Sequence, residues 1–156
     1  MYLAMIGALM GLLPVASILT DLSSTPDASL LALTGKWFVF WASGVRLLTA
    51  GLSQILRPAF TAEHIFEIRD PEAGKIVTEL GFANVSVGLI SVLSLNFPTW
   101  TLPAAICSGL FYGLAGAKHI FNGHRNRSEN IAMVSDLFIF AVLAVYVIGT
   151  LTQSAA

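Results

Sequence analysis

Five stretches of the chain are apolar over the length of a membrane-spanning helix, and short polar segments separate them. A hydrocarbon core of ~30 Å requires about 20 predominantly apolar helical residues. The pattern predicts an all-α transmembrane helical bundle with a four-helix core plus an N-terminal helix, in a single integral membrane domain, residues 1–156. We expect the five spans at about residues 2–19, 33–56, 75–95, 102–121 and 131–151.

The first span has the length of a signal peptide, but no Lys or Arg precedes its apolar run. We therefore expect a retained span. Gly7 and Gly11 form a GxxxG pair, which favours close contact with another helix. Pro14 predicts a kink, because proline lacks the N–H that a helix interior uses.

The longest polar connection, residues 58–74, holds more acidic residues than any other segment and is expected to lie at the membrane interface. Within it, Asp70 followed by Pro71 predicts an N-cap and the start of the third helix. The connection at residues 96–100 is short and uncharged, whereas residues 122–130 form a basic loop.

Lys and Arg residues are unevenly distributed between the two sides of the predicted bundle. One side has only Lys36, and the other has Arg57, Arg69, Lys75, Arg125 and Arg127. Cytoplasmic loops carry the excess of Lys and Arg in membrane proteins. We therefore expect a cytoplasmic N-terminus and a C-terminus outside.

Composition agrees with this class and excludes another. The chain is 56% hydrophobic and only 11% charged, whereas soluble domains carry roughly 25% charged residues. Its formal net charge is −1, so it lacks the basic surface that nucleic-acid binding requires. The expected partners are the lipid bilayer and other membrane subunits or copies of the chain.

Arg46 lies in the middle of the second apolar stretch. A guanidinium cannot lose its proton to avoid burial, and placing it at mid-bilayer costs a few kcal/mol or more unless it is paired or hydrated. At ~1.5 Å per residue, Arg46 lies ~16 Å from the cytoplasmic surface. The rest of the chain should therefore supply partners for it.

Other spans place ionisable or polar groups in the same half of the membrane. Glu79 is expected ~6 Å deep and Asp136 ~9 Å deep, and either is a candidate partner for Arg46. Because charges inside membranes normally pair within the bundle, we predict one converging network of Arg46, Glu79, Asn84, Lys118, His119 and Asp136. This network is either a structural clamp or a ligand, proton or ion site.

Small residues at three- and four-residue spacing predict close helix packing around the network. They include Gly44 and Gly51 in the second span, Gly81 and Gly88 in the third, and Gly109, Gly113 and Gly116 in the fourth.

Motifs for known catalytic chemistry are absent from the sequence, which has no GxSxG, P-loop, GxGxxG or HExxH. Glu63, His64 and Glu67 form only a weak metal-ligand pattern, and His64 and His119 lack the pairing expected of haem ligands. We assign no catalytic residue, metal or cofactor.

Four stretches, residues 35–66, 77–95, 111–122 and 126–140, together resemble one family of small bacterial inner-membrane proteins of unknown function. The family motifs contain Arg46, Glu79, Asn84, His119 and Asp136. The four-helix core is also distantly similar to DoxX-type membrane proteins, some of which are linked to quinone-coupled redox chemistry. The first resemblance implies a bacterial inner-membrane location and no particular activity.

Three functions are compatible with these features. The first is a non-catalytic membrane protein, oligomeric or a subunit of a larger assembly, with the polar network holding the bundle. The second is a carrier or channel for a proton or small solute, in which Arg46, Glu79 and Asp136 form the site. The third is a quinone-linked redox accessory protein with Tyr112 and His119 near the head group.

Overall fold

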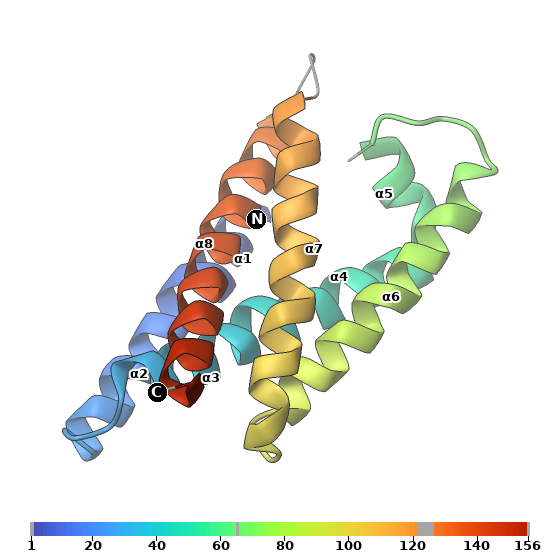
Figure 1. Ribbon diagram of the computed structural model, residues 1–156. Coiled ribbons are helices and arrows are strands. Elements are labelled where there is room, and N and C mark those ends of the chain that lie inside the picture. The colour runs from blue at the N-terminus through green and yellow to red at the C-terminus, as the bar shows by residue number, and fades with distance from the viewer. Residues whose placement is uncertain (1, 65, 122–126, 156) are drawn as a thin grey trace.

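The computed structural model describes residues 2–64, 66–121 and 127–155, and this part of the chain is helical without β-strands (Figure 1). Five of its helical segments are long and apolar enough to cross a membrane. The all-α prediction is confirmed, and the chain is a multi-pass membrane protein. Arg125, one of the residues used to predict the orientation, lies outside the described residues.

The five long segments differ in regularity. Two of them contain a π-helical stretch, in which the helix is wider than an α-helix. The first consists of α1 (Tyr2–Gly7), the π-helical η1 (Ala8–Leu12) and α2 (Leu13–Ser24), and the second of α3 (Leu30–Phe38), the π-helical η2 (Val39–Val45) and α4 (Arg46–Leu56). The remaining elements are α5 (Pro58–His64), α6 (Ala73–Leu93), the 3-10 turn η3 (Pro98–Trp100), α7 (Thr101–Phe121) and α8 (Arg127–Ala155).

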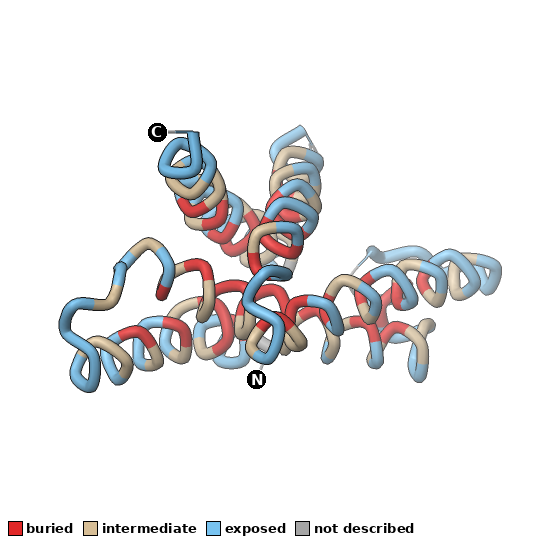
Figure 2. The backbone as a smooth tube through the Cα atoms, turned by 60° about the horizontal axis from the view of Figure 1, so that its bottom comes forward, coloured by how far each residue is buried: buried red, intermediate tan, exposed pale blue. Residues whose placement is uncertain are grey.

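The long helices form two closely packed pairs, α7 with α8 and α4 with α6. The N-terminal segment packs against α3 and η2, and α3 also contacts α8. In an oblique view, the α7–α8 pair stands apart from the layer formed by the other helices, and buried positions gather where this pair meets that layer (Figure 2). The second segment, α3–η2–α4, therefore contacts every other long helix.

Glycines let the backbones of α4 and α6 approach each other. A Cβ atom built on Gly81 would lie 2.9 Å from the carbonyl oxygen of Gly51, and one built on Gly88 would lie 3.0 Å from that of Gly44. Such distances leave no room for a side chain. The predicted close packing of these glycines is confirmed.

The GxxxG pair of the first span behaves differently. A Cβ atom built on Gly7 or Gly11 has no neighbouring atom within 4 Å. The expectation that this pair makes a close helix contact is therefore wrong within the described chain. The π-helical η1 contains Gly11 and ends just before Pro14, where the missing N–H interrupts the regular α-helical hydrogen bonds.

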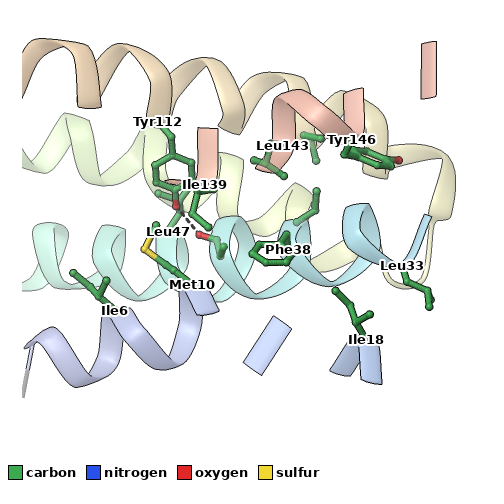
Figure 3. Close-up of a cluster of buried hydrophobic side chains, with 14 residues drawn as sticks. Ile6, Met10, Ile18, Leu33, Phe38, Leu47, Tyr112, Ile139, Leu143 and Tyr146 are labelled. Carbon is green, nitrogen blue, oxygen red and sulfur yellow. Dashed lines mark hydrogen bonds between the residues drawn. The ribbon is translucent and has the colours of Figure 1, made fainter. Parts of the chain in front are cut away.

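The largest fully buried side chains include Leu47 near the start of α4, Tyr112 on α7, and Ile139 and Leu143 on α8 (Figure 3). Many other large apolar side chains are exposed, among them Ile76, Leu114 and Phe121. Lipid tails are as apolar as these side chains, so their exposure fits helices that face lipid.

Polar contacts fasten the N-terminal segment to the second one. Asp21 accepts hydrogen bonds from Lys36 Nζ at 2.7 Å and from Trp37 Nε1 at 2.9 Å. Deeper in the same interface, Trp41 Nε1 donates to Ser17 Oγ at 3.0 Å. These bonds fix the position of α2 beside α3.

The connection at residues 58–74 contains one short helix, α5, that ends at His64. The sequence predicted that Asp70 caps a helix starting at Pro71, and this prediction is wrong. The carboxylate of Asp70 accepts from the N–H of Glu72 at 2.9 Å within a turn, and α6 begins at Ala73.

Candidate functional site

Arg46 is the first residue of α4 and follows the π-helical η2 directly. Its Nη2 lies 3.3 Å from Oδ1 of Asp136 on α8. The two side chains are only 13% and 7% exposed. The structure therefore pairs Arg46 with Asp136 rather than with Glu79, the other candidate from the sequence.

Tyr112 on α7 joins this ion pair. Its hydroxyl accepts a hydrogen bond from Arg46 Nη1 at 3.3 Å and donates to the carbonyl oxygen of Ala42 at 2.6 Å (Figure 3, dashed line). The guanidinium carbon also lies 5.3 Å from the centroid of the tyrosine ring, within the range of a cation–π contact. Arg46, Tyr112, Asp136 and the Ala42 carbonyl are called the Arg46 cluster below.

The position of Tyr112 is fixed by the fold. Its side chain is fully buried, and a buried tyrosine hydroxyl normally requires a hydrogen-bond partner. The carbonyl of Ala42 belongs to η2, and π-helical segments often occur at functional sites. The cluster thus connects the second, fourth and fifth membrane segments through one guanidinium.

A second polar contact lies beside the cluster in the same helix interface. Ser43 Oγ donates to Ser108 Oγ at 2.9 Å, and Ser108 Oγ donates to the carbonyl of Ala104 at 2.7 Å. Both serines are fully buried. Hydrogen bonds between buried hydroxyl groups replace those to water, which the hydrocarbon core cannot supply.

Asn84 belongs to a separate site, about two turns further along α4 from Arg46. Its Nδ2 donates to Gln54 Oε1 at 2.8 Å, and both side chains are buried between α4 and α6. This bond fastens the glycine-rich interface and does not extend the Arg46 cluster.

The remaining residues of the predicted network do not converge on Arg46 as expected. Glu79 is exposed on α6, Lys118 is exposed near the end of α7, and His119 is half-buried beside it. They lie on α6 and α7, whose long axes diverge towards the end of the molecule that carries α5 (Figure 1). The structure brings Arg46 and Asp136 together and leaves Glu79 and Lys118 on the surface.

Tyr112, Gln54, Ser43 and Ser108 were not included in the predicted network. Gln54 had a signal in its spacing, because Leu47, Gly51 and Gln54 share one helix face and all are buried. The two serines and Tyr112 are uncharged, so their depth in an apolar span gives little indication of which helix they contact.

The chemistry available to this arrangement is limited. Residues 2–64, 66–121 and 127–155 contain no group of three His, Cys, Asp or Glu side chains that could hold a metal ion. The Arg46 cluster consists of a cation, an anion and a phenol whose hydroxyl is held by a backbone carbonyl. It joins three helices, and its phenol hydroxyl donates to a backbone carbonyl rather than to a side-chain base.

We expect Tyr112→Phe to lower the free energy of unfolding by ~1–2 kcal/mol, because it removes two hydrogen bonds and leaves the Ala42 carbonyl without its donor. Thermal unfolding in detergent, followed by circular dichroism, measures the change. Ser43→Ala is the control and should cost less, since Ser108 keeps its bond to Ala104. Equal effects of the two substitutions would contradict the role of the hydroxyl.

Neither the curated proteins nor the solved structures contain a match to this chain. Residues 1–155 match a protein family that is described as a family of unknown function (DUF6790). Because the match extends over nearly the whole chain, the protein belongs to this family.

Proposed function

We propose that this chain is a non-catalytic subunit of a membrane assembly, made with copies of itself or with other membrane proteins. In this proposal the Arg46 cluster is a structural clamp. The observation that supports the clamp most directly is that Arg46 contacts Asp136 and Tyr112, two buried side chains from two other helices. A clamp requires such convergence, whereas a single ion pair on one helix would not hold a bundle.

The charge balance of the cluster supports the clamp. A buried guanidinium beside a buried carboxylate forms a pair without net charge, which is the usual way that charges are accommodated within membranes. In the part of the chain that the structure describes, the two cavities lined by residues 3–138 and 29–153 are formed by other side chains, and neither is lined by Arg46, Tyr112 or Asp136. Both observations favour the clamp over a carrier or channel site. The fully buried Tyr112 hydroxyl likewise gives no support to contact with a quinone head group.

The proposal of an assembly rests on Glu79. Its exposed side chain lies four residues after Lys75 and thus at the expected depth of ~6 Å in the membrane. Within the described part of the chain Glu79 forms no ion pair. A carboxylate that faces lipid at such depth is unfavourable, so we propose that a partner helix covers it.

The proposed location is a bacterial inner membrane, with the N-terminus in the cytoplasm and the C-terminus on the outer side. Arg57, Arg69, Lys75 and Arg127 all lie at the ends or connections expected to be cytoplasmic. Lys36 lies on the opposite side, where it pairs with Asp21. This distribution follows the preference of Lys and Arg for cytoplasmic segments.

Glu79→Gln should weaken self-association about tenfold, equivalent to ~1.4 kcal/mol, while the unfolding temperature changes little. The wild-type protein should show a mass above the 16.6 kDa of one chain by light scattering in mild detergent, after subtraction of the detergent. Glu63→Gln, an exposed acid on α5, is the matched control. A monomeric wild-type protein at all concentrations would exclude self-association, and equal behaviour of both variants would exclude Glu79 from the interface.

A further inference from the structure

A long apolar groove lies between the N-terminal helix and α8. Its walls are formed by Leu3, Ile6 and Met10 on one side and by Ile131, Val134 and Phe138 on the other. Its volume is about 530 Å³. The core of the protein begins directly behind it, since Ile6 and Met10 are buried in the main apolar cluster (Figure 3).

Two glycines keep this groove open. Gly7 and Gly11 line it, and a Cβ atom at either position would meet no other atom within 4 Å. The glycines between α4 and α6, in contrast, touch the backbone of the opposite helix. The GxxxG pair therefore forms the floor of an open groove and not a helix contact within the chain.

The polar residues of the groove are concentrated at one end. Arg127 and Asn130 line it where α8 begins, they lie one helical turn apart, and both are exposed. Glu129, the acidic residue of the same turn, does not line the groove. The end that faces the expected cytoplasmic surface therefore presents a cation.

The length of the groove matches one leaflet of a bilayer. Arg127 and Phe138 are eleven residues apart on α8, which corresponds to ~16 Å, about half of the ~30 Å hydrocarbon thickness. Apolar side chains of both helices line the groove over that length, as contact with a hydrocarbon chain requires.

We propose that this groove binds an acyl chain of an anionic phospholipid, with the phosphate group at Arg127 and Asn130. The apolar walls supply contacts for the chain, and the guanidinium offers two parallel hydrogen bonds to phosphate oxygens. Basic sites between membrane helices on the cytoplasmic side are a known means of selecting anionic lipids. In this proposal Arg127 selects anionic over zwitterionic phospholipids, and Gly7 and Gly11 leave the groove open to the acyl chain.

Native mass spectrometry of the full chain, released from detergent after incubation with defined lipids, tests the proposal. Wild-type protein should retain one phosphatidylglycerol about tenfold more strongly than phosphatidylcholine. Arg127→Gln should reduce that preference to near unity. Arg69→Gln, an exposed arginine in the connection before α6, should leave it unchanged.

A second variant tests the groove itself. Gly11→Leu places a side chain in open space, so the helical content should be unchanged and the retention of both phospholipids should fall at least fivefold. Equal retention of phosphatidylglycerol and phosphatidylcholine by the wild-type protein would overturn the proposal. Retention of ubiquinone in preference to phosphatidylglycerol would also overturn it, because the groove would then hold a quinone. A Gly11→Leu variant that loses self-association but keeps its lipid would overturn it as well, because the groove would then hold a second copy of the chain.

Discussion

Replacing Asp136 with leucine should lower the free energy of unfolding by about 3–5 kcal/mol, the cost of removing one partner from a buried ion pair. The loss follows from the chemistry of the residue left behind. Arg46 cannot release its proton, and in the variant its guanidinium would remain buried beside an apolar side chain. Tyr112 would still offer its hydroxyl oxygen to Arg46, but a neutral acceptor compensates less than a carboxylate.

Removing the other partner, Arg46, should lower the free energy of unfolding by less. In Arg46→Met the remaining carboxylate of Asp136 can take up a proton and become neutral, an option that a buried carboxyl group uses readily. We expect a loss of about 1–3 kcal/mol for Arg46→Met. Removing either partner of the ion pair therefore costs a different free energy, because a buried carboxylate can be neutralised by a proton whereas a guanidinium keeps its charge.

The double variant Arg46→Met/Asp136→Leu separates the pair from its surroundings. Apolar replacements of a buried ion pair are often neutral or stabilising, so the double variant should be more stable than Asp136→Leu alone. Unfolding in mixed micelles with increasing denaturing detergent gives the four free energies of the cycle. Glu63→Leu, which removes an exposed acid from α5, is the control and should change stability by less than about 0.5 kcal/mol. A double variant as unstable as Asp136→Leu would refute the clamp.

The helices were predictable because hydropathy measures what the membrane requires. The fold class and five apolar helices follow from the length of the apolar runs alone. Helix ends were less predictable, because a helix continues beyond the hydrocarbon while hydrogen bonds support it. The second segment begins at Leu30, where Ser29 Oγ accepts from the N–H of Ala32 at 3.4 Å, a few residues before the apolar run that marked the expected span.

The candidate site was predictable in depth but not in direction around each helix. Depth along a helix follows from counting residues, and it placed Arg46 and Asp136 in the same half of the membrane. Direction requires the packed face. On α8 that face is marked by Asp136, Ile139 and Leu143, which are buried at spacings of three and four residues.

The same reasoning explains the exposed position of Glu79. On α6 the residues that face α4 are Gly81, Asn84 and Gly88, and Glu79 is two residues before Gly81. At ~100° per residue, two residues turn a side chain by ~200°, so Glu79 points away from α4. The spacing of Gly81, Asn84 and Gly88 indicates which face of α6 packs against α4, whereas depth along the helix does not indicate the direction of a side chain.

The contact between α4 and α6 should be the second most sensitive feature of the protein. A Cβ atom built on Gly51 lies 2.6 Å from the carbonyl oxygen of Gly81 and 2.8 Å from the backbone nitrogen of Val85. Both neighbours are backbone atoms, which cannot rotate aside as a side chain can. Any larger residue at this position must therefore push the helices apart.

Gly51→Val should lower the free energy of unfolding by about 3 kcal/mol, at the upper end of the cost of overpacking. Separating the helices also strains the buried bond between Asn84 and Gln54, which is 2.8 Å long and lies one turn from the substituted glycine. Gly11→Val is the matched control, because its side chain enters open space and should change stability by less than about 1 kcal/mol. Similar unfolding temperatures for the two variants in detergent would show that α4 and α6 are not held by direct backbone contact. A large difference would place this interface, beside the Arg46 cluster, as the second point at which the bundle is fixed.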